Sequence, residues 1–335
     1  MLRAGEFMTH TVLVTGGAGF VGSHACKALH GAGFVPVTYD DLSGGCEKAV
    51  RWGPLERGDI RDAARLRDVL ARHRPVAALH FAARIEAGES VRDPAAFHAV
   101  NVEGTRCLLE ALQQADIASC VMSSTAAVYG APQTAPIAED HPLRPINPYG
   151  ETKLAAETML ADFAARHGSR FAALRYFNAA GADPDGELGE QHEPETHLIP
   201  LVLQVAAGKR AQITVYGSDY DTPDGTCIRD YVHVSDLAEA HVLALRHLLA
   251  GRTSLRLNLG TGQGWSVRQV IETAQRVTGH RITVQESGRR AGDPPALVAD
   301  ATQAQRVLGW RPQRAALEMQ IADAWRWMTR TAAAA

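Results

Sequence analysis

Apolar runs alternate with longer, partly polar segments along the first half of the chain. The runs at 11–15 and 171–176 are mainly apolar without strict alternation, as expected for strands buried on both faces. The segment 149–167 follows Pro148 and has the length of a helix. Strands separated by helices indicate a parallel sheet covered on both sides, so we predict an α/β fold with a Rossmann-like doubly wound parallel sheet. Further strands are predicted at 34–39, 76–82 and 118–123, and further helices at 22–30, 63–72 and 94–114.

The pattern changes after Phe177. Prolines, glycines and acidic residues crowd 183–194, and the later helices (198–207, 235–250 and 266–278) are separated by short strands and long loops. We therefore predict a first domain at 8–177 and a smaller, partly interleaved domain at 178–330, with segments of about 225–262 returning to the first. Residues 1–7 lack the apolar core of a signal peptide and are interpreted as a possible cloning remnant before Met8.

Composition excludes several classes of partner. The 335 residues carry 34 Lys+Arg against 37 Asp+Glu, a formal net charge of −3, which provides no basic surface for nucleic acid or anionic lipid. No apolar stretch approaches the roughly 20 residues that span a bilayer. The five cysteines are scattered without C-x-x-C spacing, so we expect no disulfide framework or zinc site and a reducing, cytoplasmic location.

A glycine-rich turn follows the first predicted strand. Gly16, Gly19 and Gly22 form G-x-x-G-x-x-G, in which the glycines allow a tight turn, phosphate approach and close helix–strand packing. The alternative is a plain strand-to-helix turn, but the position between strand and helix favours a site for a dinucleotide pyrophosphate.

Acidic residues follow the next two predicted strands. A carboxylate at Asp40 or Asp41 suits the ribose hydroxyls of NAD and repels the 2′-phosphate of NADP, although either aspartate could instead cap a turn. Asp59 could meet the adenine or cap the following helix. Both alternatives stay open for Asp59.

Tyr149 and Lys153 are four residues apart on a predicted helix, so they share one face. There the ammonium could lower the pKa of the phenol and allow it to act as a base. Ser123, Ser124 and Thr125 follow an apolar strand and could face the same crevice, or form a local turn. Together with the glycine turn, this pattern indicates redox chemistry on an alcohol.

Other patterns favour ordinary structural roles. The glycine loop 260–264 precedes a capping box of Ser266 and Gln269, and Ser235 with Asp236 is expected to cap another helix. The fourteen histidines show no metal-ligand spacing, so no metal site is predicted, including at His192 and His197. Two distant arginines, Arg229 and Arg290, could converge on a diphosphate, although each alone is typical of a charged surface.

Taken together, these segments resemble the extended short-chain dehydrogenase/reductase family, and closely the UDP-glucose (UDP-galactose) 4-epimerases within it. The similarity runs from about Thr11 to Trp327 and includes late blocks that belong to the sugar-nucleotide end. The segments that carry it are 14–24, 58–61, 80–83, 88–91, 123–130, 147–153, 174–178, 224–234, 258–262 and 292–294.

The resemblance implies roles for particular residues. Tyr149 would be the base, Lys153 would tune it and hold the nicotinamide ribose, and Thr125 would lie near the sugar 4-hydroxyl. Cofactor positions would be Gly16, Gly19, Phe20, Val21, Gly22, Asp40, Asp41, Leu42, Ser43, Gly44, Asp59, Ile60, Phe81, Ala82, Ala83, Asn101, Ser123, Tyr149, Lys153 and Phe177. Nucleotide-sugar positions would be Ser124, Thr125, Tyr149, Asn178, His197, Leu198, Tyr216, Arg229, Arg290, Asp293 and Leu297.

Three positions depart from the family pattern. Ile85 replaces a lysine and Val100 an asparagine that some members place near the cofactor. Leu297 stands where a bulky residue accompanies exclusion of N-acetylated sugars and a small one accompanies acceptance. Its intermediate size favours plain hexoses.

The resulting hypothesis is reversible C4 epimerisation of UDP-glucose and UDP-galactose through a transient 4-keto sugar, with NAD recycled in place. Residues 8–177 would bind NAD, residues 178–330 would mainly bind the UDP-sugar, and the resemblance suggests a homodimer. The alternatives are an epimerase for N-acetylhexosamine or pentose UDP-sugars, an NAD-dependent sugar-nucleotide dehydratase or dehydrogenase, and a dinucleotide-sensing protein without activity. A dehydratase is disfavoured because Ala126 and Ala127 follow Thr125, where related dehydratases place Asp-Glu.

Overall fold

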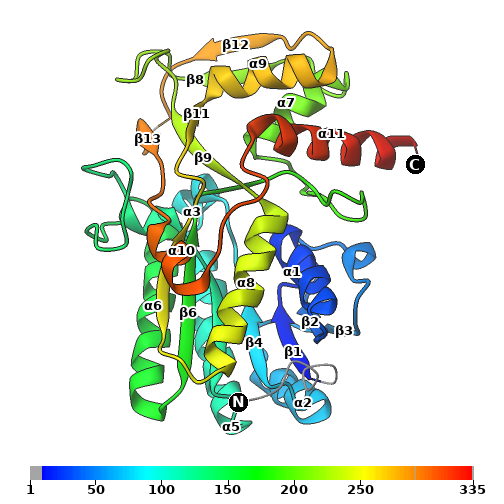
Figure 1. Cartoon of the computed structure of the whole chain (residues 1–335), viewed down its shortest axis with the longest axis vertical. Helices are drawn as coiled ribbons and strands as arrows, with labels where there is room; N and C mark the ends of the chain where they lie inside the picture. The colour runs from blue at the N-terminus through cyan, green and yellow to red at the C-terminus, as the bar shows by residue number, and fades with distance from the viewer. Residues whose placement is uncertain (1–9, 291, 334–335) are drawn as a thin grey trace.

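A computed structural model of the chain describes residues 10–290 and 292–333, so the interpretation of residues 1–7 lies outside the described residues. Its centre is a seven-stranded parallel sheet in the order β10-β6-β5-β4-β1-β2-β3 (Figure 1). The predicted Rossmann-like class is therefore confirmed. The strands are β1 (Thr11–Thr15), β2 (Val35–Asp40), β3 (Leu55–Arg57), β4 (Ala77–His80), β5 (Ser119–Thr125), β6 (Arg170–Tyr176) and β10 (Leu255–Leu259).

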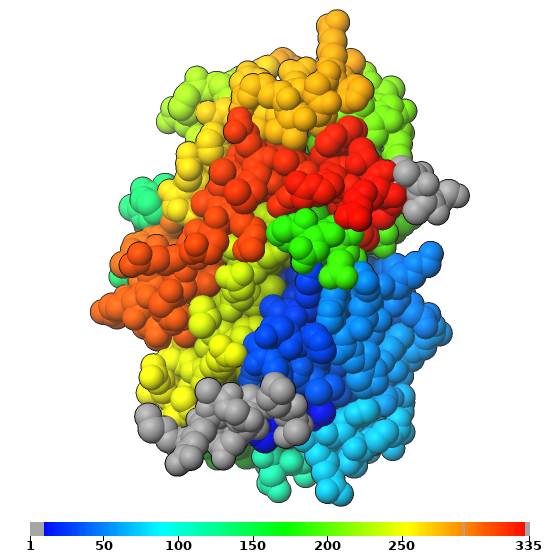
Figure 2. Space-filling model, turned by 45° about the vertical axis from the view of Figure 1, so that its right-hand side comes forward, coloured from blue at the N-terminus to red at the C-terminus, as the bar shows by residue number. Residues whose placement is uncertain are grey.

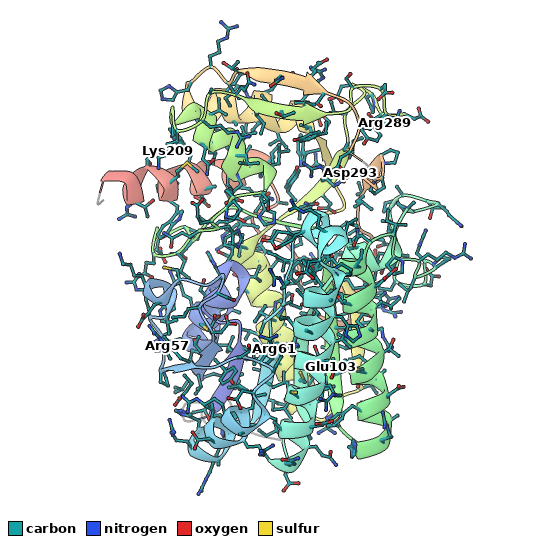
Figure 3. All side chains as sticks on the ribbon, turned by 180° about the vertical axis from the view of Figure 1, so that it is seen from behind. Arg57, Arg61, Glu103, Lys209, Arg289 and Asp293 are labelled. Carbon is teal, nitrogen blue, oxygen red and sulfur yellow. The ribbon has the colours of Figure 1, made fainter. Side chains whose placement is uncertain are left out.

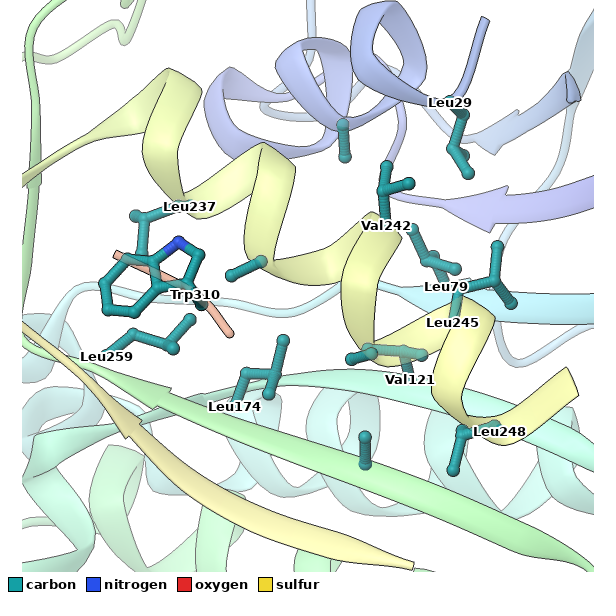
Figure 4. Packing of buried hydrophobic residues seen from close by; sticks show 14 of the residues in the cluster. Leu29, Leu79, Val121, Leu174, Leu237, Val242, Leu245, Leu248, Leu259 and Trp310 are labelled. Carbon is teal, nitrogen blue, oxygen red and sulfur yellow. The ribbon is translucent and has the colours of Figure 1, made fainter. Parts of the chain in front are cut away.

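Helices cover both faces of the sheet. Successive strand residues point to opposite faces, so each strand contributes side chains to both helical layers. Val12 and Val14 of β1 pack with α1 (Phe20–Gly31) and α8 (Val234–Leu249), whereas Leu13 packs on the other face. That other face is covered by α2 (Ala63–His73), α5 (Gly104–Gln114) and α6 (Pro148–His167). Figure 4 shows the first layer, in which Leu237, Val242 and Leu245 of α8 face the strands.

Helix α6 begins and ends where its sequence signals predict. The Asn147 side chain accepts a hydrogen bond from Gly150 N at 2.9 Å, and Pro148 occupies the first turn. The helix stops at Gly168, whose φ of +65° lies in the left-handed region. These signals fix the helix that carries Tyr149 and Lys153.

A smaller unit lies beyond the carboxyl ends of the main strands, at the top of Figure 1. Its sheet has the order β11-β9-β13, with β7 also paired to β9, and β8 pairs with β12 nearby. The strands are β7 (Asn178–Ala180), β8 (Ile213–Tyr216), β9 (Ile228–His233), β11 (Gly264–Ser266), β12 (Val284–Ser287) and β13 (Ala296–Leu297). The helices α7 (Leu198–Ala206), α9 (Val267–Thr278) and α11 (Leu317–Ala333) form its core.

The chain crosses between the two units more often than predicted. Of the segment 225–262, only α8 and β10 return to the main sheet, since β9 belongs to the smaller one. Later, α10 (Thr302–Leu308) and Trp310 pack into the main core, where the indole donates to Asp236 O at 2.9 Å. The predicted partly interleaved arrangement, with segments of about 225–262 returning to the first domain, did not include this later return.

One local prediction was wrong, and one helix is less regular than predicted. The predicted helix 94–114 is helical throughout, but it consists of α4 (Pro94–Phe97), a π-helical stretch (His98–Glu103) and α5. The prediction of the cap of α8 was wrong. Helix α8 is capped by the His233 side chain, which accepts from Ser235 N at 3.0 Å, and not by Ser235 or Asp236. Asp236 is instead buried and paired with Arg314 at 2.9 Å. Two short helical turns (Glu47–Ala49 and Ala126–Tyr129) and α3 (Ala87–Arg92) complete the secondary structure.

Within the described residues, no helix is both long enough and apolar enough to cross a membrane.

Candidate active site

The glycine turn between β1 and α1 has no room for side chains at two positions. A Cβ on Gly16, whose φ is +72°, would lie 2.5 Å from Ala82 N, and a Cβ on Gly22 would lie 2.1 Å from Gly16 O. Gly19 precedes the first turn of α1, and its side-chain position meets only Gly16 O at 3.4 Å. The turn thus brings backbone close to β4 and leaves the helix N-terminus open, which fits a pyrophosphate group.

Asp40 and Asp41 take different roles at the end of β2. The buried Asp40 carboxylate accepts hydrogen bonds from Ala18 N at 3.0 Å and Leu42 N at 2.9 Å, so it braces the glycine turn. Burial raises the pKa of Asp40, and these backbone donors partly oppose the rise. Asp41 instead caps its own turn by accepting from Ser43 N at 2.9 Å, which is the alternative left open for it.

Asp59 does not cap α2. Asp62 does, by accepting from Arg65 N at 2.9 Å. Asp59 binds the guanidinium of Arg61, and this interaction lowers the pKa of the Asp59 carboxyl. The neighbouring Ile60 is buried, and a side chain at Gly104 would collide with it.

The Tyr149 side chain lies beside Thr125 at the carboxyl end of β5. Tyr149 keeps some accessible surface, but the dense protein around it raises the pKa of its phenol to about 12, against the effect of a hydrogen bond with Thr125. Lys153 is buried one turn further along α6, and burial lowers its pKa to about 8, partly opposed by the charge of Glu157. In the chain alone, desolvation is the largest influence on both groups. The predicted lowering of the tyrosine pKa by Lys153 together with a nicotinamide stays a prediction.

Ser123 and Ser124 are engaged with protein groups. The Ser123 hydroxyl is hydrogen-bonded to the Tyr176 hydroxyl, and burial raises the pKa of that tyrosine. The Ser124 hydroxyl donates to Glu157 Oε1 at 2.5 Å in the protein interior, which points it away from a substrate. Of the three hydroxyls, Thr125 is the one next to Tyr149.

The Asn101 side chain connects the segment after β4 to helix α6 at the border of the site. Its Oδ1 accepts from Arg84 N at 2.8 Å, and its Nδ2 donates to Arg84 O and to Thr152 Oγ1, both at 3.0 Å. Asn101 is buried, so its side chain holds α6 against the segment after β4. This arrangement gives Asn101 a positioning role beside the predicted cofactor position.

Two pairs of predicted substrate residues meet in the smaller unit. Arg229 lies 3.6 Å from Asp293 and donates to Pro294 O at 2.9 Å, while the Arg290 guanidinium stacks over the Tyr216 ring at 4.5 Å. Figure 3 places Asp293 in this upper unit, apart from Arg61 in the cofactor-side unit. The members of these two pairs are 64 and 74 positions apart in sequence, so only the fold brings them together.

Comparison with known proteins decides the family. Residues 12–260 match the NAD dependent epimerase/dehydratase family. The chain belongs to this family. It is 53% identical over 317 residues to the UDP-glucose 4-epimerase of Rhizobium leguminosarum bv. trifolii, covering 95% of this chain and 97% of that protein. The resemblance drawn from the sequence is thereby confirmed over nearly the whole chain.

Solved structures of epimerases have the same fold. The UDP-glucose 4-epimerase of Brucella ovis in complex with NAD matches with a TM-score of 0.92 and 52% identity, covering 94% of this chain and 97% of that one. The enzyme from Stenotrophomonas maltophila with bound NAD and formylated UDP-arabinopyranose matches with a TM-score of 0.94 and 41% identity, covering 97% and 100%.

The sequence analysis missed a buried ion pair next to Lys153. Glu157 and Arg175 are both buried and meet at 2.6 Å, and Arg175 also donates to the Tyr129 hydroxyl at 3.0 Å. Glu157 follows Lys153 by one helical turn, so the spacing Tyr149, Lys153, Glu157 on one helix face was the available signal. Its partner lies on another strand and could not be found from spacing.

A hydroxyl and imidazole chain below the glycine turn was also missed. Thr105 Oγ1 donates to Asn101 O at 2.6 Å, so it accepts from His80 Nε2, 3.0 Å away. His80 Nδ1 then accepts from Thr15 Oγ1 at 2.7 Å. Burial lowers the pKa of His80 to about 3, so the imidazole is neutral and ties the ends of β1 and β4 together.

Leu297 lies at the boundary of the two units. It packs with Phe177 against a cluster that contains Ala126 and Tyr129, directly after Thr125 in sequence. Its strand β13 pairs with β9, with Leu297 opposite Arg229. Leu297 therefore joins the cluster that follows Thr125 to the strand that carries Arg229.

The remaining predicted positions lie around the same boundary. Asn178 begins β7 and pairs with Tyr231, and His197 directly precedes Leu198 at the start of α7. Phe81 contacts the His241 ring at 4.7 Å, and its backbone N–H, like that of Ala82, donates to Thr15 O.

Proposed function

We propose that this chain interconverts UDP-glucose and UDP-galactose by C4 epimerisation. The observation that carries the proposal is the contact of Tyr149 with Thr125 at the carboxyl end of β5, with Lys153 one turn away. The glycine turn follows β1, which is separated from β5 by β4, at the same edge of the parallel sheet. Ligands bind at this edge in doubly wound sheets.

The chain's own groups fit NAD. The open N-terminus of α1 and the turn at Gly16–Gly22 would receive the pyrophosphate, Asp40 the adenosine ribose, and Lys153 the nicotinamide ribose. When bound, NAD⁺ supplies a ring that can accept a hydride from the substrate and return it. Asp40 would favour NAD over NADP because its negative charge would repel the 2′-phosphate that NADP carries on this ribose.

Tyr149 would remove the proton from the sugar 4-hydroxyl, and Thr125 would hold that hydroxyl in place. A phenol with a pKa of about 12 is a poor base near neutrality, so the positive charge of Lys153 and a positive ring beside it must bring that pKa down. Lys153, with a pKa of about 8, remains mostly charged at neutral pH and can do so.

The smaller unit would bind the nucleotide sugar. Arg229 and Arg290 would contact the diphosphate, with Asp293, Tyr216, Asn178, His197 and Leu198 around the nucleotide. Leu297 would restrict the sugar pocket and favour plain hexoses over N-acetylated ones. Residues 8–177 would thus bind NAD and residues 178–330 mainly the UDP-sugar, except for the later segments that pack against the main sheet.

The deciding experiment is incubation of the protein with UDP-galactose, followed by proton NMR. Appearance of UDP-glucose without net NADH supports epimerisation. Accumulation of NADH absorbance would show a dehydrogenase, loss of water from the sugar a dehydratase, and no conversion a binding protein. Parallel reactions with UDP-N-acetylglucosamine and a UDP-pentose test the substrate range.

We also propose that the protein forms a homodimer and that it is located in the cytoplasm. The homodimer rests on the family resemblance, and light scattering of the purified protein tests it. All five cysteines are free, and Cys26, Cys107, Cys120 and Cys227 are buried, which suits a reducing compartment. Localisation of a tagged copy in its host tests the compartment.

A further inference from the structure

The loop between β7 and α7 brings two glutamates and two histidines to one point. The ligand atoms of Glu190, His192, Glu195 and His197 all lie within 4.8 Å of one another. We call these four residues the Glu/His cluster. Their spacing, E-x-H-x-x-E-x-H, is contained in eight residues, so one loop conformation sets all four.

We infer that the Glu/His cluster binds a divalent transition-metal ion of the zinc class. His197 would bind the metal through Nδ1, which leaves Nε2 of the same ring for the nucleotide side proposed above. The distances suit a tetrahedral N₂O₂ site. Glu190 Oε1 lies 3.1 Å from His192 Nδ1 and 2.7 Å from His197 Nδ1, and Glu195 Oε1 lies 3.4 Å from His197 Nδ1. Zinc bonds of about 2.0–2.2 Å to nitrogen and oxygen place tetrahedral ligands roughly 3.4 Å apart, so only small adjustments are needed.

The hydrogen bonding of the cluster leaves a ligand atom free. The Nδ1 atom of His197 is buried and makes no directed hydrogen bond, although Glu190 lies beside it. A buried imidazole nitrogen without a hydrogen-bond partner is costly unless a proton or a metal ion is shared there. Glu190 Oε1 and Glu195 Oε1 lie 2.7 and 3.4 Å from this nitrogen, so three potential ligand atoms meet at one point.

The charge of the cluster calls for a cation. The side chains of Glu190 and Glu195 are only 8% and 7% exposed, and within the described residues no lysine or arginine forms an ion pair with either. Two carboxylates and two neutral imidazoles would be neutralised in full by one divalent ion.

A second acidic group in the same loop shows the contrast. Asp183, Asp185 and Glu187 surround Lys27 Nζ of α1 at 2.7–2.8 Å, so they already have their cation. In Figure 2 this green segment lies between α1 in blue and α11 in red. This acidic group contains no histidine, and it serves as the control for metal binding by the Glu/His cluster.

The absence of thiolates narrows the range of metal ions that the cluster could bind. All five cysteines are free and none belongs to the cluster. Imidazole and carboxylate ligands suit Zn²⁺ and its neighbours among first-row metals, whereas Ca²⁺ and Mg²⁺ prefer oxygen ligands alone. The sequence alone predicted no metal here because the spacing matches no standard helix motif.

Cobalt binding tests the inference without reference to enzymatic activity. Untagged full-length protein is dialysed against EDTA and titrated with Co²⁺ alone, and visible absorption and metal content are measured. We expect one Co²⁺ per chain with the intense d–d bands of tetrahedral coordination, and displacement by Zn²⁺. Absence of stoichiometric uptake by the wild-type protein overturns the inference.

Matched variants locate the site. Glu190→Gln and His192→Ala should each lower Co²⁺ affinity at least tenfold while keeping the circular dichroism of the wild type. Asp185→Asn in the group around Lys27 and His280→Ala on the surface should bind Co²⁺ as the wild type does. Unchanged binding in both cluster variants would assign the metal to another place and refute the Glu/His cluster as its site.

Discussion

Glu157 and Arg175 form a buried ion pair at 2.6 Å, one helical turn beyond Lys153 on the side away from Tyr149. The pair places a fixed negative charge beside the buried ammonium of Lys153. Ser124 and Tyr129 bond to its two ends, so the pair also joins β5 and β6 to α6. The charge state of Lys153 is therefore coupled to the packing of the sheet.

Removing Arg175 should destabilise the protein strongly. Arg175→Ala leaves Glu157 buried without its partner, which costs about 3–5 kcal/mol in comparable cases. Arg256 is a matched control, since it lies 3.8 Å from the same carboxylate but is 43% exposed, and Arg256→Ala should cost less than about 1 kcal/mol. Urea unfolding measures both, and equal losses would contradict the assignment.

Removing the charge of Glu157 should shift the pH dependence of turnover. Burial lowers the Lys153 pKa to about 8 and Glu157 opposes this, so Glu157→Gln should lower that pKa further. The charged lysine is the working form. Activity should therefore fall as pH rises through its pKa, and the fall should begin at lower pH in the variant. Ser124→Ala, which keeps the carboxylate, should leave the alkaline limb in place.

Tyr149→Phe should abolish most of the epimerisation. Loss of a general base typically costs about 10²–10⁴-fold in rate, whereas nothing in the smaller unit changes, so UDP-sugar binding should persist. Calorimetry with UDP and NMR turnover separate the two effects. Tyr129→Phe removes another buried hydroxyl, one bound to Asn258 at 2.7 Å, and should retain turnover. Near-normal rates in Tyr149→Phe would remove it from the proton-transfer role.

Asp40 should determine the choice between NAD and NADP. Asp40→Asn keeps the shape of the side chain but removes the charge that would repel a 2′-phosphate, so the preference for NAD should fall about tenfold. Asp41→Asn is the neighbouring control, because Asp41 caps its own exposed turn. Mass spectrometry of cofactor bound from an equimolar mixture gives the ratio, and an unchanged ratio in Asp40→Asn would assign the selectivity elsewhere.

Two glycines of α1 should respond in opposite directions. In Gly22→Ala the new methyl would lie 2.1 Å from Gly16 O, so the turn must shift, with a stability loss of about 1–3 kcal/mol and weaker NAD binding. Gly31 has no atom within 4 Å of its Cβ position, and Gly31→Ala should stabilise the helix by up to about 1 kcal/mol. Thermal unfolding with and without NAD distinguishes the two variants.

The sequence by itself determined the parallel sheet, the glycine turn and the Tyr149–Lys153 face, because each depends on residues close together in the chain. Hydrophobic period, helix caps and the four-residue spacing are local signals, and the bounds of β1 and α6 follow them closely. The role of Asp41 as a turn cap was likewise readable as one of two alternatives.

Tertiary structure alone decided which distant groups meet and how strongly burial acts on them. The partner of Glu157 lies on β6, the Asn101 side chain joins Arg84 to Thr152 of α6, and the Trp310 indole donates to Asp236 O, 74 residues earlier. The raised pKa of Tyr149 in the chain alone could not be predicted from spacing, since desolvation depends on everything packed around a group. Burial and long-range pairing are properties of the folded whole, and no short stretch of sequence contains them.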